Sequence, residues 1–494
     1  MPDQVQEDEL ADRVDLRDMT TVTIDGETAK DFDDAVAVRR EQGGKIRLWV
    51  SIADVGHYVQ EGSLIDREAY ERGTSVYFPG QCIPMLPEHL SNGICSLNPQ
   101  VERLTMTAEM LFDRQGERLE SRFYPSVIRS RARLTYTEVS AIIEKDDGQV
   151  KAAYPHVVDD LQIMKELAER LMSMRRRRGS LDFDLPEAEI ILDLRGRIED
   201  IVRSERNLAH RLIEEFMLAA NEAVARYVSD REAPLLYRIH EAPDPEKLQE
   251  LREFARNFGH DLRLQDSQVR PGQLQELLSE VEGQAEERLI NQVLLRAMQQ
   301  ARYSPENAGH FGLAAENYCH FTSPIRRYPD LIVHRILREV ILHEGLPARR
   351  RQELEQMLPQ AGEDTSARER RAMEAEREIV TLKKCQFMVE RVGEEFEGFI
   401  SGVQSFGLFV ELKDMFVEGL VHISTLEDDF YHYEEEQYRL IGENSRRIFQ
   451  VGDSVKVKVD NVSLERLEID FRLVAPGVEG DAAAPAEGPD AESR

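Results

Sequence analysis

The chain has 494 residues, 41% of them hydrophobic and 32% charged, a composition that suits a folded protein of two to four domains, or of one large domain and a small one. Its formal net charge of -31 excludes a uniformly basic nucleic-acid-binding surface, although net charge does not decide what a local groove can hold. The four widely spaced cysteines and the absence of a long apolar run argue against a disulfide framework, a zinc site and a membrane span, so we expect a cytoplasmic protein with reduced thiols.

Residues 1–14 are polar and acidic and are expected to form a flexible lead-in. From about 15 to 125, short apolar runs interrupted by Gly and Pro turns predict a strand-rich block. From about 136 to 390 the apolar residues recur at helical spacing, and a long charged helix is expected over 364–389, after a break at 359–362. Strands followed by helices in one large unit indicate an α+β domain, a mixed sheet with surrounding helices.

The pattern changes again at about Val392, where short apolar strands contain glycines at 398, 402, 407 and 419. About 85 residues with five short strands fit a small antiparallel barrel of the OB type. The last residues, 475–494, are rich in Ala, Gly, Pro and Glu and predict a disordered acidic tail.

The stretch 23–35 places Asp25, Asp31, Asp33 and Asp34 within ten positions. Apolar runs on both sides predict short buried strands, so these carboxylates lie on a turn between two core strands. Asp31 and Asp33 share one face of an extended chain, and Asp34 reaches the other unless the backbone kinks. Four anions this close repel one another, and a hard divalent metal would relieve the repulsion. The alternative is an acidic surface turn that is merely solvated.

A second dense segment, residues 310–330, combines hydroxyls, prolines and a pair of arginines. Ser323, Arg326 and Arg327 suit an anion clamp, because guanidinium groups bind phosphate bidentately and a hydroxyl adds a donor. A solvated basic turn at the start of a helix explains the same residues equally well.

Three weaker patterns have competing interpretations. Tyr77 lies on an aromatic turn and could stack on a base, although a packed aromatic core is the simpler reading. The arginine run 175–178 could contact phosphates or form a solvated helix end. In the small barrel, we expect Phe406, Phe409 and His422 to point outward for stacking on single strands, with acidic runs in a long loop after them.

Taken together, these segments resemble the ribonuclease II/ribonuclease R (RNB) family of exoribonucleases, and ribonuclease R more closely. The resemblance extends over nearly the whole chain, and its motifs are Thr23–Asp25, Asp31–Asp34, Ile52–Val55, Thr74–Pro79, Pro84–Pro87, Leu181–Asp184, Ala209–Met217 and Tyr318–Tyr328. Gly398–Val403 and Glu418–Ser424 look like parts of an S1 domain, an OB-fold RNA binder. The expected organisation is an RNB catalytic domain over 15–390 and an S1 domain over 391–474.

The resemblance implies hydrolysis of single-stranded RNA from its 3′ end to nucleoside 5′-monophosphates. We expect the protein to be a monomer that also binds structured RNA. It matches the family aspartates to Asp25, Asp31, Asp33 and Asp34, which would hold two Mg²⁺ ions, with Mn²⁺ as a substitute, about 4 Å apart around the scissile phosphate. Asp33 is the aspartate whose loss should cost most.

The resemblance also assigns roles around the aspartates. Arg326 matches the arginine that grips the terminal phosphate, and Tyr77 matches the aromatic residue that stacks on the 3′-terminal base. Glu376 matches a glutamate that helps to select RNA, and we place Ser323 and Arg327 beside the same RNA.

Family members usually have two cold-shock domains before the catalytic block, whereas about 14 residues precede it here. We therefore expect either a naturally short form or a catalytic-plus-S1 fragment. Two other functions remain open: a non-catalytic RNA-binding protein that keeps both folds, and a metal-dependent phosphodiesterase that acts on another nucleic acid.

Overall fold

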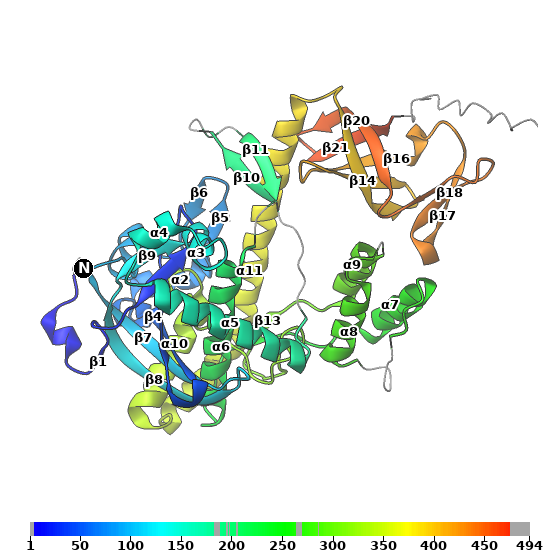
Figure 1. The fold of residues 1–494 in the computed structure, drawn as a ribbon. Helices are drawn as coiled ribbons and strands as arrows, with labels where there is room; N and C mark the ends of the chain where they lie inside the picture. The colour runs from blue at the N-terminus through cyan, green and yellow to red at the C-terminus, as the bar shows by residue number, and fades with distance from the viewer. Residues whose placement is uncertain are drawn as a thin grey trace, which may run out of the picture. The chain divides into compact units, whose positions relative to one another are not determined.

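The computed structural model describes residues 4–181, 188–193, 196, 198–203, 206–262, 269–284 and 286–474. The chain divides into two compact units, Met1–Thr381 and Leu382–Arg494, each coloured by residue number in Figure 1. The tail predicted at 475–494 lies outside the described residues. Within these ranges, every helix is too short or too polar to cross a membrane.

The core of the first unit is a seven-stranded mixed sheet. Its order is β1 (Val14–Asp15), β8 (Arg118–Arg129), β7 (Glu102–Phe112), β4 (Ile46–Ala53), β3 (Asp34–Arg40), β2 (Val22–Asp25) and β9 (Ala132–Thr135). The two outer pairs, β1 with β8 and β2 with β9, are parallel, and the inner pairs are antiparallel. Strands β4 and β7 are buried along almost their whole length, because both faces of the sheet are covered.

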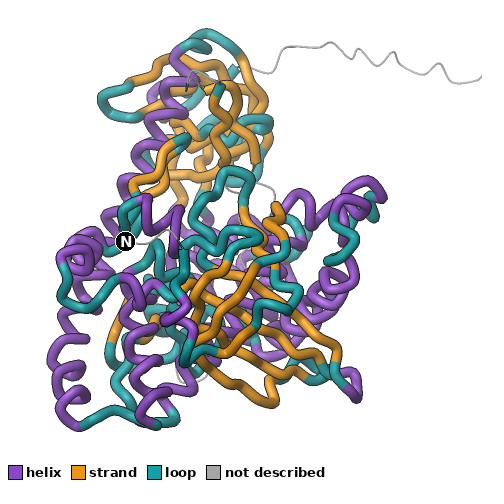
Figure 2. The backbone as a smooth tube through the Cα atoms, turned by 90° about the vertical axis from the view of Figure 1, so that its left-hand side faces the viewer, coloured by secondary structure: helices purple, strands orange, loops and turns teal. Residues whose placement is uncertain are grey.

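Helices pack around this sheet, as Figures 1 and 2 show. They are α1 (Val55–Tyr58), α2 (Leu64–Arg72), α3 (Tyr136–Ile143), α4 (Gly148–Ala153), α5 (Val158–Arg178), α6 (Leu208–Ser229) and α10 (Tyr328–His343). Helices α5 and α6 contact each other and the sheet, which confirms the helical spacing read from their apolar residues. Helices α7 (Pro245–Asn257), α8 (Pro271–Val281) and α9 (Glu287–Ala297) form a three-helix group of their own.

The described residues of the first unit also form three two-stranded sheets. They pair β5 (Val76–Phe78) with β6 (Gln81–Ile83), β10 (Ala188–Leu192) with β11 (Ile198–Arg203), and β12 (Tyr237–Ile239) with β13 (Arg302–Ser304). The last two pairs lie in the region that we predicted to be helical throughout, so the sequence pattern missed them.

The predicted helix break at 359–362 is wrong, because α11 runs without interruption from Ala348 to Val389 with Pro359 inside it. Tertiary packing holds the helix together at this point. Gly362 lies so close to strand β13 that a Cβ atom would be 2.9 Å from the Tyr303 carbonyl oxygen. The Ser366 hydroxyl accepts a hydrogen bond from the Tyr303 amide at 2.9 Å and donates one to the Gly362 carbonyl at 2.7 Å. The boundary between the two units falls inside this helix.

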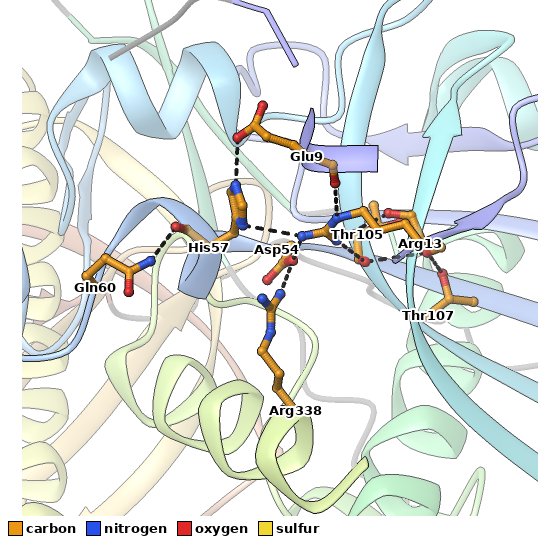
Figure 3. Close-up of polar contacts among 9 residues, drawn as sticks. Glu9, Arg13, Asp54, His57, Gln60, Thr105, Thr107 and Arg338 are labelled. Carbon is orange, nitrogen blue, oxygen red and sulfur yellow. Dashed lines mark hydrogen bonds and ion pairs between the residues drawn. The ribbon is translucent and has the colours of Figure 1, made fainter. Parts of the chain in front are cut away.

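A buried charged cluster ties α10 to the sheet and to the segment before β1 (Figure 3). Asp54 follows β4, and its carboxylate accepts hydrogen bonds from Arg13, at 2.7 Å, and from Arg338 of α10. The side chain of Asp54 is 1% exposed and that of Arg13 is 5% exposed. His57 contacts Arg13 and also Glu9, at 2.6 Å. The segment that we expected to be a flexible lead-in therefore contributes two residues to this cluster.

The second unit contains the predicted small barrel, although it is not antiparallel throughout, because β16 and β21 pair in parallel. Strands β14 (Glu395–Gln404), β15 (Gly407–Leu412), β16 (Glu418–His422), β21 (Glu468–Leu473) and β20 (Ser454–Ser463) close on one another in that order. The long acidic loop that we predicted after β16 is partly wrong, because it contains a three-stranded sheet of β17 (Tyr431–Glu434), β18 (Arg439–Gly442) and β19 (Ile448–Gln450). Its buried residues Tyr431, Leu440 and Phe449 explain why this segment folds.

Candidate active site

The four aspartates line one cavity in the first unit. Asp25 is the last residue of β2 and Asp34 is the first residue of β3, while Asp31 and Asp33 lie on the connection between them. The cavity has a volume of about 280 Å³, and all four aspartates contribute to its wall. The strands on both sides are buried, as predicted from the apolar runs. An acidic turn that is merely solvated does not fit this geometry, because Asp33 is only 4% exposed.

Burial raises the pKa of Asp25, Asp33 and Asp34, and neighbouring negative charges reinforce the shift of Asp25 and Asp33. Burial, reinforced by the charges of Asp34 and Asp31, raises the pKa of Asp25 to about 8. Burial raises the pKa of Asp34 to about 6, against the opposing charges of Arg326 and Arg327. Burial also raises the pKa of Asp33 well above its usual range. The site therefore favours a bound cation or bound protons.

Two carboxylate oxygens indicate what the site lacks. Asp25 Oδ2 and Asp33 Oδ2 are buried and have no hydrogen-bond partner. A buried carboxylate oxygen left in this state is costly unless a cation or donor reaches it. Oxygen ligands of this type are those that Mg²⁺ and Mn²⁺ prefer. The donor set therefore fits a divalent cation.

The aspartates do not form a complete metal cage by themselves. Across the described ranges, no group of three or more His, Cys, Asp or Glu side chains is gathered closely enough to hold a metal ion alone. This arrangement suits Mg²⁺, which usually keeps several waters and uses one or two carboxylates together with substrate phosphate oxygens. The substrate would complete the coordination.

The loop before α10 brings Arg326 to the aspartates. The amide of Ile325 donates to Asp33 Oδ1 at 2.8 Å, and Arg326 Nε lies 3.6 Å from Asp33 Oδ2. The Arg326 side chain is 43% exposed, so part of the guanidinium remains available to a ligand. Ser323 is buried, and its hydroxyl accepts a hydrogen bond from Arg326 Nη2 at 3.0 Å. Ser323 thus positions the arginine.

The two neighbouring arginines have different surroundings. Arg327 donates to both oxygens of Asp330, at 2.9 and 2.7 Å, and Asp330 is fully buried. Burial acts to lower the pKa of Arg327. The charge of the Asp330 carboxylate and its hydrogen bonds act in the other direction, and the pKa lies above its usual range. Arg327 also lines the cavity, but its hydrogen bonds hold the loop in place. From the sequence we expected both arginines to clamp an anion. In the structure, Arg326 is half-exposed and available to a ligand, whereas Arg327 pairs with Asp330 and holds the loop.

The β5–β6 hairpin carries Tyr77 to the edge of the same site. Tyr77 is 42% exposed, so the packed-core reading of this aromatic residue is wrong. Its hydroxyl donates to Asp31 Oδ2 at 3.1 Å, and its amide donates to Glu376 Oε1 of α11 at 2.7 Å. The segment leading into the hairpin is also bound to the arginine loop, because the Ser75 amide donates to the Arg326 carbonyl at 2.9 Å. Tyr77, Glu376 and Arg326 are thus held in one framework.

Further residues that we had not assigned to the site also line the cavity, among them Tyr136 of α3, Glu214 of α6 and Asn221 of α6. Asn221 is buried, donates to the Tyr318 hydroxyl at 3.1 Å and accepts from the Phe321 amide at 2.9 Å. A signal for these two α6 residues was present in the sequence. They are polar residues seven positions apart and therefore lie on one face of the helix, but that spacing alone does not place the helix beside the aspartates.

In the second unit, the aromatic residues expected to face outward do lie near one another. Phe406 is 44% exposed, and its ring is 6.0 Å from that of Phe409 on β15. His422, at the end of β16, is exposed and pairs in register with Gly407. Phe409 and His422 lie on adjacent strands of the barrel, and Phe406 lies on the turn between β14 and β15.

The comparisons with known proteins agree with this architecture. A family model described as the RNB domain matches residues 13–343, and a model of the S1 RNA binding domain matches residues 390–473. Ribonuclease R 1 of Lactococcus lactis is 47% identical over 475 residues, which cover 96% of this chain but only 58% of that relative. The chain therefore spans little more than half the length of this curated relative.

Two solved structures are similar throughout the matched region. RNase R of Mycoplasma genitalium in complex with ribose methylated single-stranded RNA has a TM-score of 0.88 at 31% identity, with 95% of this chain and 73% of that chain covered. The same enzyme in complex with double-stranded RNA has a TM-score of 0.83 at 29% identity, with 95% and 78% covered.

Proposed function

Because this chain belongs to the RNB family, which includes ribonuclease R, and combines an RNB domain with an S1 domain, we propose that it is a 3′-to-5′ exoribonuclease that releases nucleoside 5′-monophosphates. The observation that supports this proposal best is the cavity that unites four aspartates with Arg326. Such a combination suits a metal-dependent phosphodiester hydrolase, because that class binds cations and must also counter the charge of the phosphate that reacts.

Different residues of the chain would have different roles in this reaction. Asp25, Asp31, Asp33 and Asp34 would hold two Mg²⁺ ions, or Mn²⁺ in their place. Bound there, the metal pair would activate water and stabilise the leaving 3′-oxygen. Arg326 is placed to bind the scissile or terminal phosphate, since its half-exposed guanidinium already points at Asp33.

Other residues would position the RNA. The exposed ring of Tyr77 offers a stacking surface for the last base, and Glu376 holds the backbone of Tyr77 in place. Ser323 would act on RNA through its hydrogen bond to Arg326, and Arg327 through the loop that it anchors to Asp330.

Outside the cavity, we assign Phe406, Phe409 and His422 to binding single-stranded RNA by stacking, the usual mode of OB-type barrels. The solved relatives are complexes with single-stranded and with double-stranded RNA, so we propose the single-stranded 3′ end as substrate and structured RNA as a further one.

We assign the catalytic domain to 15–390 and the S1 domain to 391–474. We propose a monomer in the cytoplasm; the four free cysteines, three of them buried, suit that reducing compartment.

A 5′-labelled single-stranded RNA tests the proposal. The wild-type chain and Asp33→Asn are each incubated with the RNA in Mg²⁺ or in EDTA. The labelled RNA is then separated by length, and the released mononucleotides are identified separately. We expect a descending ladder and 5′-monophosphates only for the wild type in Mg²⁺. RNA binding without shortening would favour a non-catalytic RNA-binding protein, and equal degradation of a DNA oligonucleotide would favour a broader phosphodiesterase.

A further inference from the structure

A second cavity lies on another face of helix α6, and its lining is strongly basic. It has a volume of about 340 Å³, within the range of small-molecule sites. Five arginines and three glutamates line it, an excess of positive charge in a chain whose formal net charge is -31. The arginines come from the end of α5, the start of β8 and the C-terminal part of α6.

Helix α6 separates this arginine cavity from the aspartates. Glu214, Met217 and Asn221 face the aspartate cavity, whereas Glu215 and Glu222 face the arginine cavity. The side chain of Leu218 lines both cavities. An α-helix is about 10–12 Å wide with its side chains, so the two cavities are neighbours.

The arginines are not fully explained by the pairs that they form. Arg178 binds both oxygens of Glu222, at 2.8 and 2.6 Å, and Arg175 Nη1 lies 3.5 Å from a Glu215 oxygen. These pairs join α5 to α6, and this structural role is sufficient to explain the presence of one arginine for each glutamate. They leave spare donors, however. Arg175 Nε and Nη1 and Arg178 Nε are buried and have no hydrogen-bond partner.

Arg175 is the most informative of these residues, because its side chain is only 9% exposed, its Nε has no partner, and its Nη1 has the 3.5 Å ion pair with Glu215 but no hydrogen bond. A buried donor without an acceptor costs about 1–3 kcal/mol. Arg118 on the opposite side experiences the same crowding: burial, followed by the nearby charges of Arg226 and Arg178, lowers its pKa from the usual value. An anion with several oxygens would satisfy these donors and reduce the repulsion among the guanidinium groups.

We propose that the arginine cavity binds the phosphate group of a nucleoside 5′-monophosphate, the product released at the aspartates on the other side of α6. The phosphate would take the unused donors of Arg175 and Arg178, with Arg118 as the third cation, and the remaining volume would accommodate the nucleoside. The identity of the ligand rests on the proposed function, whereas the anion site itself rests only on the arginines.

Equilibrium dialysis of the full chain with radiolabelled AMP in EDTA tests this inference without turnover. We expect saturable binding that Arg118→Gln and Arg175→Gln each weaken by about tenfold or more. The matched control is Arg67→Gln, an exposed arginine on α2, which should not change the affinity. If Arg175→Gln fails to fold, as judged by circular dichroism, Arg118→Gln at the edge of the cavity decides the test.

Two further arms locate the ligand and identify it. Asp33→Asn should retain AMP binding, since the arginine cavity does not include the aspartates. Loss of binding in Asp33→Asn, with normal binding in both arginine variants, would place AMP in the catalytic cavity and overturn the proposal. Adenosine should fail to compete. Inorganic phosphate that competes as well as AMP would show that the nucleoside is not recognised, and would also overturn it. Because no RNA is cleaved in this assay, its failure is separate from failure of the exoribonuclease proposal.

Discussion

Adjacent arginines with different surroundings allow a sharp test of the site. We predict that Arg326→Gln lowers the rate of RNA cleavage by about 100- to 1,000-fold, the usual cost of removing one donor to transition-state charge. Arg326 is 43% exposed, makes one side-chain hydrogen bond, to Ser323, and lies 3.6 Å from the buried Asp33 carboxylate, so the free energy of unfolding should fall by about 1–2 kcal/mol, less than for Arg327→Gln.

The corresponding substitution of Arg327 should mainly lower the free energy of unfolding and have little direct effect on the rate of cleavage. Arg327→Gln removes the bidentate partner of Asp330, which is fully buried, and leaves a carboxylate without a compensating charge. We expect the free energy of unfolding to fall by about 3–5 kcal/mol, the usual cost of breaking a buried pair from one side.

Single-turnover cleavage of 5′-labelled RNA gives the rate of the chemical step, and urea denaturation gives the stability of the same preparations. Cleavage is measured at a temperature where Arg327→Gln is still folded. The reasoning would be refuted if Arg326→Gln cleaved RNA at nearly the wild-type rate, or if Arg327→Gln lost activity while its urea midpoint stayed unchanged.

Three further results are expected. Tyr77→Ala should weaken RNA binding by about 1–3 kcal/mol in a filter-binding assay, whereas Tyr77→Phe, which loses only the hydrogen bond to Asp31, should bind nearly as well as the wild type. Asp54→Asn should lower the free energy of unfolding by about 3–5 kcal/mol in urea, because Arg13 would be left buried without a charge partner. Burial, with the nearby charge of His240, lowers the pKa of His310 to about 3, so between about pH 6.5 and pH 3 the unfolded chain binds a proton there that the folded chain does not. Stability should therefore be lost as the pH falls below about 6.5, and a His310→Asn variant should show a smaller decrease in Tm between pH 7.5 and pH 5.5.

The sequence was informative where one local pattern determines the outcome. Apolar runs on both sides of the aspartate turn predicted the two buried strands, and helical spacing predicted α5, α6 and α10. Alternation and glycine positions were sufficient to predict the five-stranded barrel. In each of these cases the burial of a periodic apolar face dominates the free energy, and that periodicity can be read directly.

The predictions failed where distant residues decide the structure. Pro359 and Gly362 look like a helix break, but the contact of Gly362 with Tyr303 of β13 stabilises a continuous α11. Arg326 and Arg327 look equivalent in the sequence, and only the positions of Asp33 and Asp330 distinguish them. Asn221 could not be assigned to the site because its helix had not been placed beside the aspartates.

The electrostatics of the site are compatible with the proposed action of an acidic chain on an acidic polymer. Without a cation, Asp25, Asp33 and Asp34 have raised pKa values and two buried oxygens without partners, so repulsion is already present inside the folded protein. Binding of a cation removes that repulsion and at the same time makes the cavity attractive to a phosphate. Arg326, fixed by Ser323 and Asp33, is the charge that stays in place whether or not a cation is bound. Under the proposed function, attraction for RNA at this site would therefore be local and would depend on the cation, which is compatible with a net charge of -31 over the whole chain.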